Sequence, residues 1–514
     1  MNPDPADTPN AGQRQHLAVG GERPPGRVKS EEPVRVVRRP ERVESDDKRV
    51  ITRPFEHNFR RARSILSRAL RLSDAEAAEL LDLTRQKFSA RHRNLDRVFL
   101  ENFEAVSPFV DDPSEISETR RKLIGAYFTM EYSIESAAIF NPSLVPHPDQ
   151  TGVPAGAVRV LMSLRAVGEG HLSSIVFRQA VVTREGAIHF DPPPEYASWA
   201  RPAAWPEYNK RRFMRKLLRI QPHLSVLRKV FDRLPDPFTL AELDAAVTAL
   251  QEGGAGTMYR PIAKEILWLA NAHYTLQFPR QGRAEETVIF PATDHERRGM
   301  EDLRLVRFVD DDGQVRYHGT YTAYDGQRSL PMLMSTVDFN HFDIRPLGGR
   351  YVKDKGMALF PRKVNGQYLM ISRHDGENLY LLRSEDLEFW DEGQQIQAPV
   401  EPWELVQIGN SGSPIETDAG WLLLTHGVGP VREYSLGAIL LDRNDPSQVI
   451  GRLRKPLLAP TTEEREGYVP NVVYTCGALL HDDKLILPYA MSDVSTRFAY
   501  VHLSELLEEL RNGA

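Results

Sequence analysis

Residues 299–309 read Gly-Met-Glu-Asp-Leu-Arg-Leu-Val-Arg-Phe-Val, in which a charged motif runs into an apolar strand pattern. An apolar run at 288–290 precedes it. Glu301, Asp302 and Arg304 therefore lie at the start of a predicted strand, where two carboxylates and a guanidinium form a compact acid/base site. Successive side chains of a strand point to opposite faces, so if the strand has already begun here, at most one of the two carboxylates can face a given cleft. Taken alone, the motif is better explained as a structural ion pair, and the surrounding sequence decides between the two.

From 285 onward the chain is a series of short apolar strands separated by turn signals. Strand patterns also occur earlier, at 158–164 and 174–182. Repeats of roughly 50–65 residues fit the blades of a β-propeller, although spacing alone does not exclude a sandwich. The fold class expected from this pattern is mainly β. The turn signals that recur at this interval are Asp311-Asp312-Gly313, Asn365-Gly366, Asp418-Ala419-Gly420 and Asp482-Asp483.

Two helical regions interrupt the β pattern, one over 51–137 and the other an insertion over 193–284. In the first region, Ser73-Asp74-Ala75-Glu76 is a capping box that opens a helix through Phe88. Further helical runs there cover 95–103 and about 117–134. The insertion contains a second capping box, Thr239-Leu240-Ala241-Glu242.

Residues 1–50 contain seven prolines and no aromatic residue, with many charges of both signs. Such a segment buries too little apolar surface to offset its ordering entropy, so we expect a disordered tail. The expected division is a tail over 1–50, a helical region over 51–137, a helical insertion over 193–284, and a β portion in two parts over 138–192 and 285–508.

The composition is that of an ordinary globular protein, with 41% hydrophobic and 26% charged residues in a chain of 514. The net charge of −6 argues against a nucleic-acid partner. No stretch approaches the ~18 apolar residues of a membrane span. The N-terminus lacks the basic start and apolar core of a secretory signal, so the expected location is cytoplasmic. Cys476 is the single cysteine, which excludes intramolecular disulfides and Cys-rich metal sites.

Further polar clusters lie at the edges of predicted strands on both sides of the opening motif. They are Asn141-Pro142-Ser143, Arg165, Ser173-Ser174, Tyr321–Gly326 with Arg328, Lys355–Pro361, Ser372-Arg373, Trp421–Val428, Tyr434–Ala438, Pro470–Val473 and Tyr489–Asp493. This ordered series resembles glycoside hydrolase family 130, the β-mannoside phosphorylases and their hydrolytic relatives. The resemblance covers about 138–190 and 285–505 and implies a five-bladed β-propeller with a central funnel-shaped active site. Both helical regions fall outside it.

The resemblance implies a role for each matching residue. The family motif Gly-x-Glu-Asp-Pro-Arg matches 299–304, with Leu303 in place of proline, so Asp302 is expected to be the catalytic acid. The positions expected to hold the sugar are Asn141, Arg165, Arg304 and Asp493. The positions expected to surround phosphate are Arg328, Lys355, Arg373 and His426.

The implied activity is inverting phosphorolysis of a β-mannoside oligosaccharide, which gives α-mannose 1-phosphate. Phosphate is itself the nucleophile, so the reaction needs a proton donor and a cationic pocket, with no metal or other cofactor. Arginine suits phosphate because its planar fork makes two parallel charge-assisted hydrogen bonds. Asp302 must be protonated when substrate is bound, which requires partial burial or the like charge of Glu301 nearby.

Two alternatives remain open in the sequence. An inverting β-mannosidase would use water and needs a carboxylate base where phosphate would sit, for which Glu416 and Glu377 are candidates. A propeller without catalysis would bind carbohydrate or protein, although Asp302 within the full polar series argues against this. His426 is nearly as well explained as a buried core histidine. The helical segments are candidate contacts of a homo-oligomer or a cap over the funnel, and linkage, acceptor and chain length stay open.

Overall fold

The computed structural model describes residues 34–513, except 221–223, 253–258, 280–282 and 354. In this part of the chain the protein is mainly β, with five sheets of four to six strands and one two-stranded sheet. We number the larger sheets 1 to 5 by a strand at one end of each, in chain order: β4 (Ala138–Pro146), β12 (Met300–Val309), β16 (Ala358–Leu359), β20 (Gln407–Asn410) and β25 (Val473–Tyr474).

Sheets 1 and 2 have six strands each. Sheet 1 has the order β4-β5-β6-β11-β8, with β7 also paired to β6; its further strands are β5 (Val158–Val167), β6 (Ser173–Val182), β7 (Ile188–Phe190), β8 (Ser198–Trp199) and β11 (Thr287–Ile289). Sheet 2 has the order β12-β13-β14-β15-β10-β9; its further strands are β13 (Val315–Tyr324), β14 (Ser329–Thr336), β15 (His341–Pro346), β10 (Tyr274–Gln277) and β9 (Pro202–Ala204).

Sheets 3 to 5 follow along the chain. Sheet 3 is β16-β17-β18-β19, with β17 (Tyr368–Ser372), β18 (Leu379–Ser384) and β19 (Glu392–Gln397). Sheet 4 is β20-β22-β23-β24 plus β21, with β21 (Ile415–Thr417), β22 (Gly420–Val428), β23 (Tyr434–Leu441) and β24 (Val449–Arg452). Sheet 5 is β1-β28-β27-β25 plus β26, with β1 (Val37–Val43), β26 (Leu479–His481), β27 (Lys484–Met491) and β28 (Ser495–His502).

The predicted turns join neighbouring strands of these sheets. Asn365 and Gly366 connect β16 to β17 and both have a positive φ, of 52° and 78°. Asparagine and glycine tolerate this left-handed conformation, which two-residue hairpin turns require. Val364 and Gln367, which flank them, exchange backbone hydrogen bonds of 2.9 and 3.1 Å. Local sequence therefore predicts this connection correctly.

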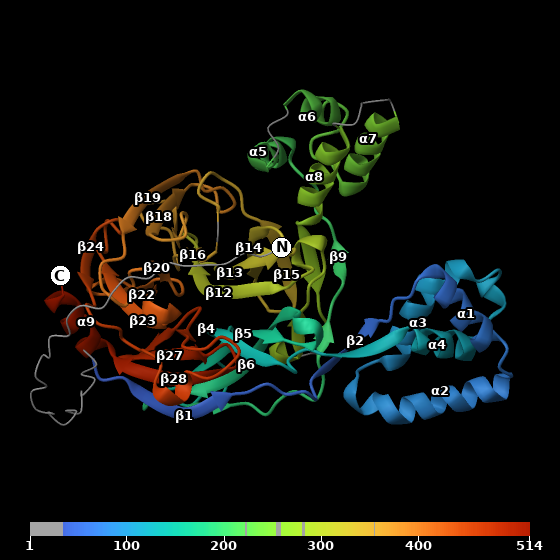
Figure 1. Cartoon of the computed structure of the whole chain (residues 1–514), viewed down its shortest axis with the longest axis horizontal. Coiled ribbons are helices and arrows are strands. Elements are labelled where there is room, and N and C mark those ends of the chain that lie inside the picture. Colours follow the sequence, from blue (N-terminus) through green and yellow to red (C-terminus); the bar gives the residue numbers. More distant parts are fainter. Residues whose placement is uncertain (1–33, 221–223, 253–258, 280–282, 354, 514) are drawn as a thin grey trace, which may run out of the picture. The chain divides into compact units, whose positions relative to one another are not determined.

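The predicted disordered tail is wrong for residues 37–43, which form β1. This strand pairs antiparallel with β28 from the other end of the chain, with Val37 opposite Tyr500 and Val43 opposite Thr496 (Figure 1). The prediction of disorder from composition is wrong here because an edge strand is stabilised by backbone hydrogen bonds and needs few apolar side chains. Residues 1–33 of the predicted tail lie outside the described part.

The helical region contains α1 (Phe59–Leu70), α2 (Asp74–Phe88), α3 (Leu95–Val106) and α4 (Glu118–Tyr127). The capping box predicted at Ser73 opens α2, with reciprocal hydrogen bonds between Ser73 and Glu76. The predicted helix over 117–134 ends earlier, at Tyr127. After it β3 (Thr129–Ser133) pairs with β2 (Val50–Pro54) in the two-stranded sheet.

The insertion contains α5 (Lys210–Ile220), α6 (Leu224–Phe231), α7 (Leu240–Glu252) and α8 (Tyr259–Asn271). The capping box predicted at Thr239 opens α7, because Thr239 and Glu242 exchange hydrogen bonds. The insertion is not helical throughout, since it also supplies β8 to sheet 1 and β9 and β10 to sheet 2. A last helix, α9 (Leu503–Asn512), follows β28. Among the described helices, none combines the length and apolar character that a bilayer crossing requires.

Candidate active site

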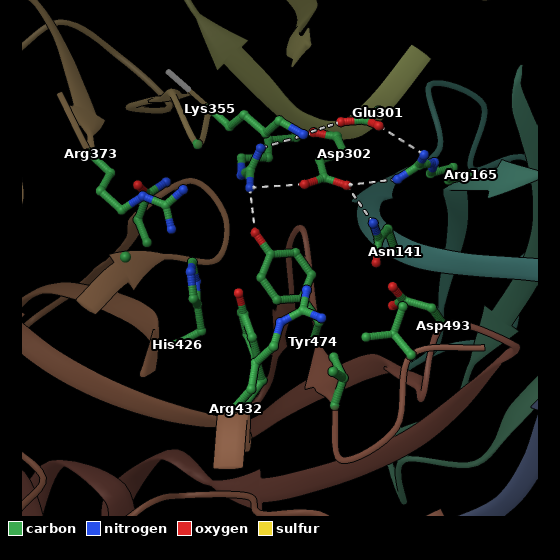
Figure 2. A pocket seen from close by; sticks show the side chains of 17 residues that line it. Asn141, Arg165, Glu301, Asp302, Lys355, Arg373, His426, Arg432, Tyr474 and Asp493 are labelled. Atoms are coloured by element: carbon green, nitrogen blue, oxygen red, sulfur yellow. Dashed lines mark hydrogen bonds and ion pairs between the residues drawn. The ribbon is translucent and has the colours of Figure 1, made fainter. Parts of the chain in front are cut away.

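A pocket of about 270 Å³ is lined by strand residues of sheets 1, 2, 4 and 5 and by residues of neighbouring loops, including the loops before β16 and after β17 of sheet 3 (Figure 2). Sheet 1 provides Asn141 and Arg165, and sheet 2 the opening motif. The side chains named in Figure 2 that line it are Asn141, Arg165, Glu301, Asp302, Lys355, Arg373, His426, Arg432, Tyr474 and Asp493. The structure thus brings eight of the nine predicted site residues together, and Arg328 is the exception.

Breaks in strand register place the central polar groups. The pairing of β12 with β13 shifts between Glu301 and Arg304, and Asp302 has a φ of 57°. The pairing of β4 with β5 shifts in the same way beside Asn141, whose φ is 52°. Such bulges re-aim side chains, and Asn and Asp tolerate the left-handed region better than other non-glycine residues. Glu301 and Asp302 therefore both line one pocket, and the expectation that a regular strand would separate them is wrong.

The two carboxylates of the motif have different surroundings. Glu301 Oε1 accepts a hydrogen bond of 3.0 Å from Arg165 Nη2, and its Oε2 accepts one from Lys355. Asp302 Oδ1 accepts a hydrogen bond from Asn141, and Arg165 Nη1 lies 3.9 Å from the same oxygen. Glu301 is thus bound directly by two cations, whereas the direct side-chain donor to Asp302 is a neutral amide.

Arg304 is fixed by three hydrogen bonds inside the pocket wall. Its Nε donates to the backbone oxygen of Ser411 at 3.0 Å, and Nη1 donates to the backbone oxygen of Asp302 at 3.0 Å. Its Nη2 donates to the Tyr474 hydroxyl at 2.6 Å and lies 3.8 Å from Asp302 Oδ2. A buried guanidinium held in this way is a rigid positive charge next to the acid.

Asp493 occupies the turn between β27 and β28, with a φ of 54°. Burial, followed by the negative charge of Asp302, raises the pKa of Asp493 to about 6, although Arg165 and Arg432 oppose the shift. A carboxyl with this pKa exchanges a proton near neutral pH. As a neutral group it can also donate a hydrogen bond to a sugar hydroxyl.

The other side of the pocket is basic. Figure 2 shows Arg373 and His426 on this side, with Asn141, Arg165 and Asp493 on the opposite side and Asp302 between them. Burial, with the nearby charges of Arg373 and Arg304, holds the pKa of His426 well below its usual value, so the imidazole is neutral. Arg373 therefore supplies positive charge on this side, Lys355 adds a second cation where it binds Glu301, and His426 supplies a neutral hydrogen-bonding ring.

Several buried polar atoms of the lining have no hydrogen-bond partner among the described residues. They are Asn141 Oδ1, both side-chain polar atoms of Asn410, and His426 Nδ1. Buried polar groups in proteins are nearly always satisfied, and each exception calls for an explanation such as a catalytic role or a bound water or ion. A polyhydroxylated ligand offers both donors and acceptors to these atoms.

Arg328 lies outside the pocket lining. Its Nη1 donates to Glu265 Oε2 at 2.9 Å, and its guanidinium lies 4.5 Å from the ring centre of Trp268. Both partners belong to α8 of the insertion, which lies outside the residues that the family resemblance covers. The assignment of Arg328 to a phosphate site is therefore replaced by a contact with the insertion.

The two candidate bases also lie outside the lining. Glu416 binds Arg362, with 2.8 Å between Oε2 and Nε, and hydrogen bonds from Arg362 lower its pKa. Glu377 is exposed in the turn before β18. Among the described residues, the carboxylates that line the pocket are Glu301, Asp302 and Asp493. No three His, Cys, Asp or Glu side chains of the described chain gather as metal ligands would.

Sequence reasoning missed Arg432, Asn410 and Tyr474, which also line the pocket, and it named the cluster that begins at Tyr434 without assigning that residue a role. Asn410 is the last residue of the short strand β20 and could have been found as a polar residue at a strand end. Arg432 carries no such signal, because it is placed by a loop in which Val431 and Arg432 both have positive φ values, of 57° and 58°. A β-branched residue in that conformation is an outlier typical of functional loops.

This arrangement, an acid and fixed cations in a polar pocket at the meeting point of five sheets, is that of a carbohydrate-active enzyme. Residues 272–512 match the family model described as β-1,4-mannooligosaccharide phosphorylase, which is glycoside hydrolase family 130. A 1,2-β-oligomannan phosphorylase of Thermoanaerobacter sp. is 33% identical over 235 residues, which cover 44% of this chain and 75% of the relative. The chain belongs to glycoside hydrolase family 130.

Further relatives have related activities. A β-1,2-mannobiose phosphorylase of the same Thermoanaerobacter is 34% identical over 226 residues, 43% of this chain and 72% of that protein. The solved structure of a β-1,2-mannobiose phosphorylase of Listeria innocua, in complex with β-1,2-mannobiose, is 18% identical with a TM-score of 0.44. The aligned region covers 74% of this chain and 93% of the Listeria innocua chain. The assignment to the family rests on the sequence matches.

Proposed function

We propose that this chain is an inverting phosphorylase that cleaves a β-mannoside with inorganic phosphate and releases α-mannose 1-phosphate. The observation that carries the proposal is one pocket in which Asp302 faces a basic wall formed by Lys355 and Arg373. The named relatives that match the chain are mannoside phosphorylases, which supports this activity.

In this proposal the sugar to be transferred lies against Asn141, Arg165, Arg304 and Asp493, and phosphate lies against Lys355, Arg373 and His426. A phosphate oxygen attacks the anomeric carbon while the bond from that carbon to the glycosidic oxygen breaks. The glycosidic oxygen leaves as an acceptor hydroxyl and takes the proton of Asp302, by way of a mannose hydroxyl as the family resemblance implies. A single displacement from the opposite face inverts the anomeric centre.

The charges of the site suit this proton transfer. Bound phosphate would neutralise part of the positive charge of Lys355 and Arg373 and place negative charge in the pocket. Glu301 is engaged by Arg165 and Lys355, so we assign it a supporting role and not that of a base. Asp493, with its pKa of about 6, is a second carboxyl able to hold a proton near neutral pH.

A hydrolase on the same scaffold is less well supported. Water attack requires a carboxylate base on the side of the anomeric carbon opposite the acid. Glu416 and Glu377 do not line the pocket, and Glu416 is paired with Arg362. The basic wall therefore favours phosphate as the nucleophile.

We further propose that the five larger sheets are the blades of a β-propeller around the pocket. Contacts between sheets that follow one another support it: β4 with β12, β12 and β13 with β16, β17 with β20, β23 with β25, and β27 with β4. The pairing of β1 with β28 would close such a ring, because it joins the two ends of the described chain in sheet 5. A cytoplasmic location and a homo-oligomer through the helical segments stay predictions of the sequence.

The acceptor sugar is proposed to lie at the pocket rim. Among the described residues, the two most exposed large hydrophobic side chains are Val431 at 89% and Tyr468 at 67%. They adjoin Arg432 and Val469, which line the pocket. The Tyr468 ring stacks on His171 with 5.7 Å between ring centres, so it presents a flat apolar face to a sugar ring.

The proposal is tested by incubating the protein with β-1,2- or β-1,4-mannobiose, with and without phosphate, and measuring mannose 1-phosphate and free mannose. Mannose 1-phosphate formed only with phosphate supports phosphorolysis. Release of mannose at a rate independent of phosphate would show a hydrolase. Binding of mannobiose without any turnover would show a non-catalytic carbohydrate-binding protein.

A further inference from the structure

The helix α5 of the insertion binds an acidic turn of sheet 3, far away in the sequence. Its basic residues Arg212, Arg215, Lys216 and Arg219 are spaced three and four apart, so they share one face of the helix. The turn over 386–391, between β18 and β19, provides the acceptors. Arg212 binds Asp386, Lys216 Nζ lies 2.7 Å from Glu388 Oε2, and Arg215 and Arg219 lie 2.6 and 3.0 Å from the carboxylate of Asp391.

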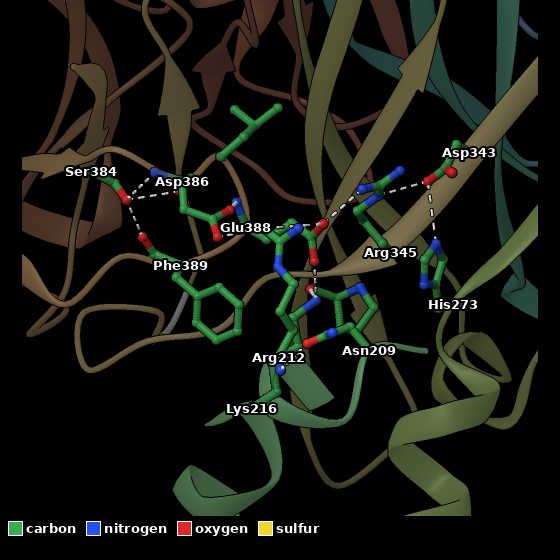
Figure 3. Close-up of polar contacts among 12 residues, drawn as sticks. Asn209, Arg212, Lys216, His273, Asp343, Arg345, Ser384, Asp386, Glu388 and Phe389 are labelled. Carbon is green, nitrogen blue, oxygen red and sulfur yellow. Dashed lines mark hydrogen bonds and ion pairs between the residues drawn. The ribbon is translucent and has the colours of Figure 1, made fainter. Parts of the chain in front are cut away.

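The centre of this contact is buried (Figure 3). The Lys216 side chain is 10% exposed, and its Nζ also donates to the backbone oxygen of Pro346 at 2.8 Å. Burial alone would raise the pKa of Glu388, but the charges of Lys216 and Arg345 outweigh it and lower that pKa to about 2. A buried, fully bonded ion pair fixes geometry, and removing one partner leaves a costly unpaired charge.

The same acidic turn holds a second segment, residues 348–351, through four hydrogen bonds. Gly348 N donates to Glu388 O at 2.8 Å, Trp390 N donates to Gly348 O at 2.8 Å, and Tyr351 N donates to Trp390 O at 3.0 Å. Arg350 N donates to Asp391 Oδ1 at 2.8 Å. Asp391 therefore connects Arg215 and Arg219 of α5 directly to the backbone of 348–351.

Segment 348–351 lies close in sequence to one cation of the basic wall and contacts the chain neighbour of the other. Lys355 follows Tyr351 by four residues and lines the pocket. The Tyr351 ring lies 4.7 Å, centre to centre, from the ring of His374, which is the neighbour of Arg373 in the chain. One short segment thus contacts the residue next to Arg373 through a ring contact.

We propose that the helical insertion sets the geometry of the phosphate wall, with Arg215 and Arg219 as positioning residues that act through Asp391 and segment 348–351. The inference rests on the proposed function, because it assigns phosphate to Lys355 and Arg373. The family model matches from residue 272 onward, so α5 lies outside the matched region. This connection gives the insertion a role in the chemistry beyond covering or assembling the protein.

The test compares two variants of α5 in the full chain. Arg215→Gln with Arg219→Gln removes both cations from Asp391. Arg212→Gln is the matched control, because it removes a cation of the same helix that makes no contact with Asp391: Arg212 hydrogen-bonds Asp386 and lies 4.0 Å from Glu388 Oε1. The measurements are the melting temperature, the dissociation constant of inorganic phosphate by calorimetry, and KM for phosphate and for mannobiose separately.

We expect the double variant to weaken phosphate binding and to raise KM for phosphate about tenfold, since small displacements of binding groups are costly. KM for mannobiose should change less than twofold, and Arg212→Gln should keep wild-type values. Asp391→Asn retains an oxygen for Arg350 N, so it should raise KM for phosphate by less than the double variant and by more than Arg212→Gln. This variant replaces the double variant in the test if the double variant does not fold. Unchanged phosphate binding in these variants, or an equal loss for mannobiose, overturns the inference while the proposed function stands. Absence of phosphate binding in the wild type overturns both.

Discussion

Replacement of the proposed acid, Asp302→Asn, should remove the proton donor while keeping the architecture of the site. Asparagine tolerates the positive φ of 57° at this position, and its side-chain oxygen can still accept from Asn141. The register shift of β12 should therefore persist. We expect a melting temperature within about 2 °C of wild type, because a substitution that keeps the backbone conformation and the side-chain size changes the free energy of unfolding little.

The catalytic loss should be large. General acid catalysis typically contributes roughly 10²–10⁴-fold, which corresponds to about 3–5 kcal/mol of transition-state stabilisation. We expect kcat for mannobiose phosphorolysis to fall by that factor, with phosphate binding retained because Lys355 and Arg373 are unchanged. The assay is the initial rate of mannose 1-phosphate formation at saturating phosphate.

A substrate that needs no acid provides the control. An aryl mannoside with a good leaving group departs without protonation, so Asp302→Asn should slow its cleavage much less than that of mannobiose. An equal loss for both substrates would refute the role of Asp302 as proton donor. A loss below about tenfold for mannobiose would refute it as well.

Three further predictions concern other residues of the pocket. The pKa of Asp493 is about 6 in the folded chain and near 4 when unfolded, so the neutral carboxyl stabilises the fold below pH 4 and this contribution is lost as pH rises through 6. Asp493→Asn should therefore stabilise the protein by roughly 2–3 kcal/mol at pH 7.5 and not at pH 4, measured by thermal unfolding; an equal effect at both pH values contradicts the assignment. Arg373→Gln should raise KM for phosphate about tenfold or more and leave KM for mannobiose within about threefold, and steady-state kinetics showing the reverse pattern would place Arg373 on the sugar. Tyr468→Ala should raise KM for the acceptor in the synthetic direction about fivefold, at roughly 1 kcal/mol for a lost ring contact, whereas an unchanged acceptor KM would remove Tyr468 from the acceptor site.

Features that depend on neighbours in sequence were predictable. The capping box at Ser73 and the Asn365-Gly366 turn use hydrogen bonds and backbone angles within a few residues, and both occur as expected. The membership of Asp302 in a polar site followed from the ordered series of motifs. These signals survive in sequence because each is local or is repeated along the chain.

Features that depend on distant partners were not predictable. The register shift that brings Glu301 and Asp302 into one pocket is a property of the pairing between β12 and β13. Arg328 forms an ion pair with Glu265 of the insertion, and the residues around Arg328 in the sequence do not indicate where the insertion lies. β1 is stabilised by β28 from the other end of the chain, so its own composition predicted disorder.

The central claim is that phosphate is the nucleophile, and the anomer of the first product tests it directly. The measurement is time-resolved NMR of β-1,2- and β-1,4-mannobiose cleavage in phosphate buffer. We predict α-mannose 1-phosphate as the initial product, formed in equal amount to the phosphate consumed. Initial formation of free mannose, with the phosphate concentration unchanged, would contradict the account.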